Sequence, residues 1–249
     1  MSRPLILSLF PGIDLLGRAF EEVWPEACVV RGPDLVWGGE IKTFHPPAGM
    51  FDAVIGGPPC QAFSRLRYLV EHNGHEVAPD LIPEYERVVA ETAPPWFLME
   101  NVCEAPIPYV AGYYVDSVAM SDHWTGGETR RRRRFSFGTR LDLMLTRRLV
   151  PDYPALCRPD PEPPVLASGG DSGGRPGRQR RKWRKGASAQ GFKTLAYLAT
   201  ALRGQGLPPD FLASAPMTVA GKIKLVGNGV PMAMGRAIAS AVRRAVEAL

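Results

Sequence analysis

Apolar residues follow two patterns that alternate along the chain. Short and almost unbroken apolar runs, typical of buried strands, cover residues 4–9, 27–30, 51–55 and 96–99. A helical spacing of apolar residues, with repeats three and four positions apart, covers residues 15–24 and 84–92. Strands that alternate with helices predict an α/β fold, in which a mostly parallel, twisted sheet carries helices on both faces.

Two further elements complete the predicted fold. Residues 113–120 and 134–138 are candidates for an antiparallel ribbon at the edge of the sheet. Residues 231–249 have the pattern of a strong amphipathic helix with Pro231 near its start. Its apolar stripe consists of Met234, Ala237, Ile238, Ala241, Val242 and Ala245.

The composition changes after about residue 139. Residues 151–187 are rich in proline, glycine and basic residues, a composition that cannot build a large core and favours loops. Regular patterns return near Ser188. We therefore predict one α/β domain from residues 1–138, completed by residues 188–249, with a small loop-rich region at residues 139–187.

The composition also argues against several classes of protein. The 249 residues suit one large domain, and the chain has neither a secretory signal nor a run of about 18 apolar residues. No CxxC pair occurs among the four cysteines, which are Cys28, Cys60, Cys103 and Cys157. We expect a monomer in the reducing cytoplasm, with no membrane span, no metal site and no disulfide framework.

Positive charge is concentrated in one segment. The formal net charge is +5, but residues 175–185 carry seven positive charges and no acid, which leaves −2 for the rest of the chain. Such a patch favours a polyanionic partner such as nucleic acid, and the alternative is a solvated basic loop. Trp183, inside the patch, either stacks on a base or packs against the protein, and packing is the favoured interpretation.

The segment from Gly56 to Ser64 carries the clearest chemical signal, with the sequence Gly-Gly-Pro-Pro-Cys-Gln-Ala-Phe-Ser. It follows the predicted strand 51–55, and α/β proteins bind ligands at the carboxyl ends of such strands. Pro58 and Pro59 stiffen the backbone before Cys60, because each ring fixes φ. A thiol held in a fixed place suits a nucleophile better than a core residue.

Three more positions follow predicted strands or turns. Phe10-Pro11-Gly12 lies between a strand and a helix, where the backbone is able to approach a cofactor closely. Glu40 is a candidate for binding an adenine or ribose, although a loop acid is more often only solvated. Glu100 follows the strand 96–99, and a carboxylate there either caps a helix or serves as an acid whose pKa is raised.

Five consecutive arginines, Arg130 to Arg134, precede the apolar Phe135-Ser136-Phe137. If this stretch is extended, Arg130, Arg132 and Arg134 share one face, and the other two arginines share the opposite face. One set is then able to point into a site while the other meets phosphates. The alternative is an exposed edge strand that is blunted by charge.

Six stretches occur in a characteristic order. They are Phe10-Pro11-Gly12, Pro58-Pro59-Cys60-Gln61-Ala62-Phe63-Ser64, Glu100-Asn101-Val102, Arg132-Arg133-Arg134, Gln205-Gly206-Leu207-Pro208-Pro209-Asp210-Phe211 and Gly227-Asn228-Gly229-Val230. In this order they resemble the DNA cytosine-5 methyltransferase family, nearly end to end except for residues 139–187. The Pro-Pro-Cys-Gln loop is specific to this family. The other five stretches occur in the family's order, which argues against chance agreement.

The resemblance implies a mechanism. The target cytosine swings out of the duplex, and the thiolate of Cys60 attacks C6 of its ring. Glu100 is expected to bind the exocyclic amine and to protonate N3, while Arg134 holds O2 with support from Arg132. Carbon 5 then takes the methyl group of S-adenosylmethionine, and loss of the C5 proton releases Cys60.

The resemblance also implies a Rossmann-like site for S-adenosylmethionine across the strand ends. The expected cofactor residues are Phe10, Gly12, Ile13, Asp34, Glu40, Ile41, Pro58, Asn228 and Val230. The chain departs from the family pattern in three places. Asp14 stands where a further glycine is usual, no acid directly follows the second strand, and Arg130 takes the place of a glutamine.

Residues 139–187 correspond to the segment that recognises DNA sequence in this family. A region this small has room for few base contacts, so we expect a recognition site of roughly two to four base pairs. The expected DNA contacts come from the cysteine loop and the basic patch, at Gln61, Ser64, Arg178, Arg180, Arg181, Lys182 and Arg184.

The expected function is DNA cytosine-5 methylation of double-stranded DNA, in a protein of bacterial or viral origin, with or without a restriction partner. A close alternative acts on RNA, although the short motifs of the transfer-RNA branch are not found in the recognition segment. Another is a DNA-binding protein without turnover, against which intact Cys60, Glu100 and Arg134 argue. Transfer of a different group from a modified cofactor is not excluded by the sequence.

Overall fold

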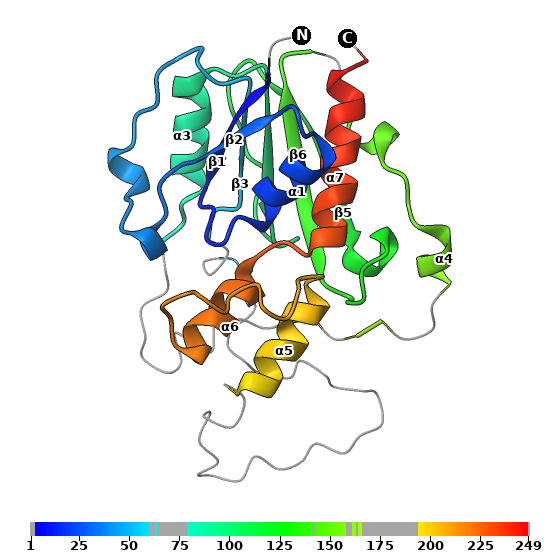
Figure 1. Ribbon diagram of the computed structural model, residues 1–249. Coiled ribbons are helices and arrows are strands. Elements are labelled where there is room, and N and C mark those ends of the chain that lie inside the picture. The colour runs from blue at the N-terminus through cyan, green and yellow to red at the C-terminus, as the bar shows by residue number, and fades with distance from the viewer. Residues whose placement is uncertain are drawn as a thin grey trace.

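The computed structural model describes residues 3–59, 63, 79–141, 143–157, 161–162, 164–165 and 194–248. These residues form a six-stranded sheet in the order β2-β1-β3-β4-β6-β5 (Figure 1). The strands are β1 (Leu5–Leu9), β2 (Cys28–Arg31), β3 (Ala53–Gly56), β4 (Trp96–Asn101), β5 (Tyr114–Ser121) and β6 (Arg132–Thr139). Strands β1 to β4 are parallel, and β6 is antiparallel to both of its neighbours. The predicted α/β fold is confirmed, with an antiparallel ribbon at the sheet edge.

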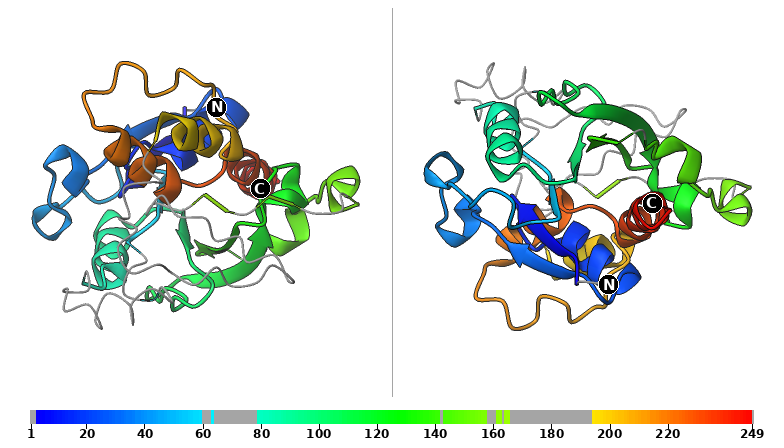
Figure 2. Two further views of the ribbon diagram at one scale, coloured as in Figure 1. Left: turned by 90° about the horizontal axis from the view of Figure 1, so that it is seen from below. Right: turned by 90° about the horizontal axis from the view of Figure 1, so that it is seen from above.

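Helices cover both faces of this sheet. The α-helices are α1 (Leu15–Val23), α3 (Ile82–Thr92), α4 (Tyr153–Leu156), α5 (Leu195–Gly204), α6 (Val219–Asn228) and α7 (Met232–Val246). Short 3-10 helices are η1 (Leu35–Trp37), η2 (Ile41–Thr43), η3 (Asp122–Thr125) and η4 (Thr146–Arg148). Helices α1 and α7 lie side by side on one face and α3 lies on the other (Figures 1 and 2).

The two faces divide the core by strand parity, because successive side chains of a strand point to opposite sides. On β4, Trp96 and Leu98 pack in the cluster that contains α1 and α7. Phe97 and Met99 pack in the cluster that contains α3. Since both faces are buried, the strands are apolar at consecutive positions, which explains the unbroken runs in the sequence.

Helices α5 and α6 lie beyond the carboxyl ends of the parallel strands (Figure 1). They pack against the start of α1 in a third apolar cluster, which includes Leu15, Leu198 and Ile223. The approach is close at the end of α6, where a Cβ atom on Gly229 would lie 2.6 Å from Leu15 Cδ1. The last part of the chain therefore returns to the edge of the sheet where β1 ends.

The helices predicted from periodicity match α1, α3 and α7 to within a few residues at each end. No helix within the described ranges is long and apolar enough to span a bilayer. The division into residues 1–138, 139–187 and 188–249 stays a prediction, because residues 158–160, 163 and 166–193 lie outside the described part of the chain.

Candidate active site

A cavity of about 350 Å³ opens at the carboxyl ends of β1, β3 and β4. Most of its lining residues fall within segments 8–16, 33–41, 56–59, 100–102, 131–133 and 224–230. Open α/β sheets bind their ligands at this edge, because the loops that follow the parallel strands converge there. The cavity is therefore the candidate site, and its walls come from segments that are far apart in sequence.

The turn between β1 and α1 has an unusual backbone. Phe10, Gly12 and Asp14 all have positive φ angles, of 53°, 55° and 54°. A Cβ atom on Gly12 would meet nothing within 4 Å, so the cavity side of this turn is open. The Gly12 peptide is held from outside the turn, because its N–H donates to Asp34 Oδ2 at 2.8 Å and its carbonyl accepts from Trp37 Nε1 at 2.7 Å.

Asp14 stands where the family usually has a glycine. Its side chain is buried and has a structural role. Its Oδ1 accepts from the Gly17 N–H at 3.1 Å, which caps α1, and from Ser8 Oγ at 2.8 Å. Its Oδ2 lies 2.9 Å from Arg31 Nε, so the buried charge has a cationic partner at the end of β2. The substitution thus changes what fixes the turn and leaves the turn in place.

The missing acid after β2 also has a geometric reason. A Cβ atom on Gly32 would lie 3.0 Å from Leu9 Cδ2 and 3.1 Å from the Ser8 carbonyl oxygen, so there is little room for a side chain. Asp34, two residues later, lines the cavity instead. Its carboxylate accepts from the Gly12 and Val36 N–H groups, which fixes its position at the cavity wall.

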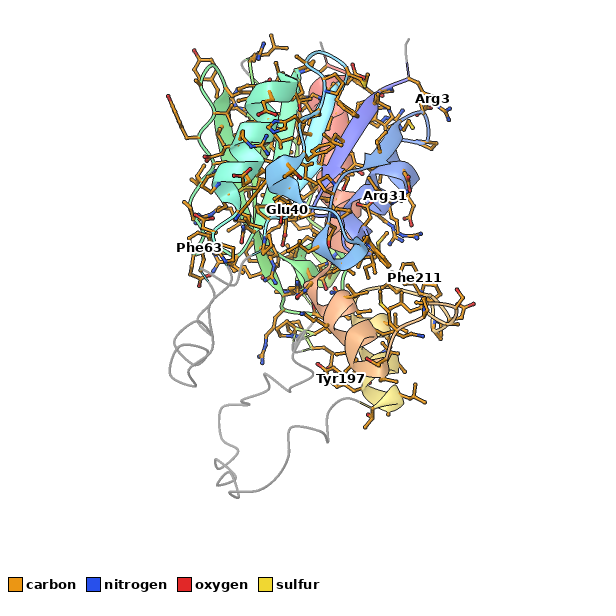
Figure 3. The ribbon with its side chains drawn as sticks, turned by 90° about the vertical axis from the view of Figure 1, so that its left-hand side faces the viewer. Arg3, Arg31, Glu40, Phe63, Tyr197 and Phe211 are labelled. Atoms are coloured by element: carbon orange, nitrogen blue, oxygen red, sulfur yellow. The ribbon has the colours of Figure 1, made fainter. Side chains whose placement is uncertain are left out.

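Glu40 and Ile41 were both expected at the cofactor. Ile41 is buried and lines the cavity, whereas Glu40 is exposed, is not among the lining residues and caps η2 by accepting from the Lys42 N–H. Figure 3 views the molecule from the side that carries Glu40 and Arg31. The carbonyl oxygen of Ile41 accepts from Arg87 Nη2 at 2.8 Å, so helix α3 holds this wall in place.

Glu100, at the end of β4, is buried within the cavity wall. Its Oε1 lies 2.9 Å from Arg133 Nε, and the two side chains are only 10% and 18% exposed. Its Oε2 lies 2.8 Å from the position that a Cβ atom on Gly57 would occupy. A side chain at position 57 would therefore crowd the Glu100 carboxylate beside the loop that leads to Cys60.

Asn101 connects the same strand to that loop. Its Nδ2 donates to the Pro58 carbonyl oxygen at 3.2 Å, and its Oδ1 accepts from the Val102 N–H at 2.8 Å. Asn101 is buried, so these bonds are shielded from water and hold the two strand ends together. The two adjacent residues thus have different roles, because Glu100 faces the cavity and Asn101 fixes the proline loop.

The arginines differ from the expected orientation. Arg131 and Arg133 line the cavity, whereas Arg132 and Arg134 do not. Arg132 is exposed, and Arg134 Nη1 donates to the Ala105 carbonyl oxygen at 2.8 Å. The arginines alternate between two opposite faces, as predicted. However, the arginines that line the cavity are Arg131 and Arg133, and not Arg132 and Arg134 as expected.

The reason lies in the pairing of β4 with β6. Phe135 is opposite Glu100, and Phe135 packs with Leu98 on the face of α1 and α7. Residues two apart on a strand share a face, so Arg133 lies on the same face as Phe135 and Glu100. The alternation of Phe135 and Phe137 was the signal in the sequence that could have identified Arg133.

Arg131 joins three distant parts of the chain. It is 4% exposed and donates to the carbonyl oxygens of Val165, at 3.2 Å, and Asn228, at 3.4 Å. Asn228 and Val230 both line the cavity, as expected for the last motif. Arg131 therefore ties the start of β6 to the end of α6 and to the segment before residue 166.

A buried carboxylate supports this region. Asp122 Oδ2 accepts from both the N–H and the Oγ1 of Thr129, at 3.0 and 2.7 Å. Burial raises the pKa of Asp122, and its bonds to Thr129 only partly offset that effect. Asp122 thus fixes the residues that lead into the arginine run.

Several predicted residues lie outside the described part of the chain. They are the catalytic candidate Cys60 and the DNA-binding candidates Gln61, Ser64, Arg178, Arg180, Arg181, Lys182 and Arg184. Their roles stay predictions. Among the described residues, no group of three or more His, Cys, Asp or Glu side chains is arranged to hold a metal ion.

Comparison with known proteins shows what part of the chain is similar to. Residues 39–105 match the family model for C-5 cytosine-specific DNA methylase. The type II methyltransferase M.SacI of Streptomyces achromogenes is 38% identical over 76 residues, which cover 26% of this chain and 19% of M.SacI. The type II methyltransferase M1.HphI of Haemophilus parahaemolyticus is 45% identical over 51 residues, or 20% of this chain and 14% of that protein. Each match thus spans less than a fifth of the relative's length.

Solved structures share the fold over the whole chain. The S. pombe Dnmt2 methyltransferase has a TM-score of 0.63 at 14% identity and covers 99% of both chains. A DNA modification methyltransferase encoded within an E. coli prophage has a TM-score of 0.54 at 16% identity, over 98% of this chain and 99% of its own. The family match over residues 39–105 and the motif residues at one cavity make this chain similar to the C5 cytosine methyltransferases, and the solved structures show that it shares their fold.

Members of this family take their methyl group from S-adenosylmethionine, and the described residues fit that donor. The cavity is of the size that proteins use for small ligands. Leu35 and Val36 line it although they are 69% and 47% exposed, and Ile41 adds a further apolar wall. Asp34 supplies a fixed carboxylate beside the open turn at Gly12. Apolar walls with one polar anchor suit a nucleoside.

Proposed function

We propose that this protein is a DNA cytosine-5 methyltransferase that works through a covalent bond between Cys60 and C6 of a flipped cytosine. The observation that carries the proposal is the pair of Glu100 and Arg133, which lie 2.9 Å apart in the wall of one cavity. Pro58 and Pro59 line the same cavity and directly precede Cys60 in the sequence.

Glu100 and Arg133 divide the recognition of the base between them. A protonated Glu100 donates to N3 of the cytosine, and a second contact from its other oxygen takes the exocyclic amine. Arg133, a permanent cation with several fixed donors, holds the O2 oxygen. We assign this task to Arg133 in place of Arg134, because Arg133 lines the cavity beside Glu100.

The covalent step follows from these contacts. The Cys60 thiolate adds to C6, and the electron pair displaced from the C5–C6 bond is accommodated by the ring as N3 takes the proton from Glu100. Carbon 5 becomes nucleophilic in consequence. S-adenosylmethionine supplies an electrophilic methyl group on a sulfonium. A base then removes the C5 proton, and the electrons of that bond expel the Cys60 thiolate.

We assign the donor to the part of the cavity between β1, β2 and α6. Eight of the nine residues expected from the sequence line it, namely Phe10, Gly12, Ile13, Asp34, Ile41, Pro58, Asn228 and Val230. Glu40 is not assigned to it, because it is exposed and caps η2. Asp34 takes the role of the ribose-binding acid, since its carboxylate is fixed at the cavity wall.

DNA is the proposed substrate because the family model that matches residues 39–105 is a DNA methylase by name and because the chain carries a basic patch at residues 175–185. Neutralisation of phosphates by this patch would make binding depend strongly on salt. The short recognition segment, the monomeric state and the cytoplasmic location are parts of the same proposal.

One trapping experiment tests it. The protein is incubated with labelled S-adenosylmethionine and DNA that carries 5-fluorocytosine, whose fluorine cannot leave as a proton does. We expect a covalent protein–DNA complex with the wild type and none with Cys60→Ser. Matched RNA with 5-fluorocytosine provides the comparison. Trapping on RNA alone would change the substrate, and no trapping on either would contradict the covalent mechanism.

A further inference from the structure

The cavity contains a cation that the proposed chemistry does not use. Lys224, on α6, lines the cavity together with Asn228, which follows four residues later on the same helix face. Lys224 is exposed, and no hydrogen bond or ion pair of its side chain occurs among the described residues. Both neighbouring arginines are engaged. Arg133 faces Glu100, and Arg131 donates to two carbonyl oxygens.

The other charges of the cavity decide what this cation is able to bind. Acidic side chains at the cavity are Asp14, which is paired with Arg31, Asp34, at the start of η1, and Glu100, on β4. S-adenosylmethionine carries a single anionic group at neutral pH, the carboxylate of its amino acid part. That carboxylate is repelled by Asp34 and attracted by an unpaired ammonium group, whereas Glu100 is paired with Arg133.

The position of Lys224 fits the amino acid end of the donor. The end of α6 packs against Leu15, the first residue of α1, as the close approach of Gly229 shows. Lys224 lies one helical turn before Asn228, about 6 Å back along the axis of α6. The lysine therefore lines the same cavity as the open turn at Gly12 and Ile13.

We infer that Lys224 binds the carboxylate of the donor and thereby selects donors that have an intact amino acid part. This inference rests on the proposed function, because it assigns one more contact to the same donor site. It makes Lys224 a binding residue that fixes one end of the donor while the sulfonium methyl is presented to the base.

A binding experiment in the absence of nucleic acid tests the inference. Calorimetry compares S-adenosylhomocysteine with its decarboxylated analogue, for the wild type, Lys224→Met, Lys224→Arg and Lys222→Met. Lys222 is the matched control, because it is on the same helix but donates to the Leu212 carbonyl oxygen and does not line the cavity. Thermal melting of each variant checks that the fold is intact.

We expect the wild type, Lys224→Arg and Lys222→Met to bind the carboxylated ligand roughly tenfold more tightly, as for one charged hydrogen bond. Lys224→Met should lose most of that preference while it binds the decarboxylated analogue as well as the wild type does. The inference would be overturned if Lys224→Met still bound the carboxylated ligand about tenfold more tightly than the decarboxylated one. It would also be overturned if Lys224→Met lost affinity equally for both ligands.

Two other outcomes separate this inference from the function on which it rests. If the wild type binds both ligands equally, the donor site stands and the role of Lys224 is refuted. If the wild type binds neither ligand, the proposed function itself fails. A Lys224→Met variant that keeps its ligand preference but binds DNA with a shallower salt dependence would assign the lysine to a phosphate instead.

Discussion

Arg133 Nε lies 2.9 Å from Glu100 Oε1, across the pair of strands in which β6 runs antiparallel to β4. The two side chains share a face because Phe135, two residues after Arg133, is directly opposite Glu100. Both are largely buried, so their attraction is weakly screened. The pair links the acid and the cation of the proposed base-binding site before any substrate arrives.

Replacement of Arg133 should abolish most activity, and replacement of Arg132 should not. We expect Arg133→Ala to lower kcat by a factor of about 10² to 10³, as for loss of one fixed donor to a developing charge. Arg132→Ala is the matched control, because Arg132 is exposed and does not line the cavity. Its kcat at saturating DNA should stay within about threefold of the wild type. Equal losses in the two variants would refute the assignment.

Glu100→Gln should lower turnover without lowering the affinity for the cofactor product S-adenosylhomocysteine. The amide keeps the shape of the side chain but has no acidic proton to give, so we expect kcat to fall by a factor of about 10² to 10⁴. The affinity for S-adenosylhomocysteine should change little, as measured by calorimetry. Glu22→Gln, in an exposed pair with Arg236, serves as the control. Turnover of Glu100→Gln close to that of the wild type would exclude proton donation by this residue.

Gly138→Ala should destabilise the fold without touching the site. A Cβ atom on Gly138 would clash with the Phe97 ring in the core, so the ring or the strand must move. We expect a loss of about 2 kcal/mol or more, which corresponds to a fall in Tm of roughly 5 °C. Gly221→Ala on α6 is the control, because its nearest contact would be an ordinary 3.4 Å and alanine favours a helix. A Gly138→Ala protein with an unchanged melting curve would contradict this packing.

Glu91 should contribute to stability only above acidic pH. The hydrogen bond from Arg87 lowers the pKa of Glu91, with a further contribution from His45. A carboxylate whose pKa is lower in the folded state stabilises the protein above its unfolded pKa, and that contribution is lost as pH falls through the folded value. We expect Glu91→Gln to be less stable by ~0.5 kcal/mol at pH 7, and we expect this difference to disappear as the pH falls through the lowered pKa of Glu91. Urea unfolding at several pH values measures this, and a constant difference would disprove it.

Local patterns predicted the strands and the principal helices, because burial on both faces leaves continuous apolar runs that need no knowledge of the partners. The orientation of the arginines was not accessible in the same way. It depends on the pairing of Phe135 with Glu100, two residues that are 35 positions apart and are brought together by the sheet. Side chains of a strand alternate between its two faces with a period of two residues. An error of one position therefore reverses the direction of every side chain.

The cofactor turn shows a second limit. The sequence indicated that Asp14 is unusual for the family, but its partner Arg31 lies on another strand. A charged residue in a tight turn is accommodated only when a cation is placed beside it, and that placement is a property of the folded sheet. From the sequence, Glu40 was either a cofactor residue or a solvated loop acid, and its role as a cap was not accessible because it depends on the exact start of η2.

All six strands precede residue 140, since β6 ends at Thr139 and the chain adds only helices and loops afterwards in the described residues. Among the described residues, the strand pairs of the sheet therefore involve none of residues 140–193, but Leu145 packs in the core with Phe135 and Thr146 donates to Asp116 on β5. If this segment reads the DNA sequence as proposed, it is exchangeable for one that reads other bases, provided that Leu145 stays in the core, the carbonyl of Val165 still meets Arg131 and α5 still reaches Leu15.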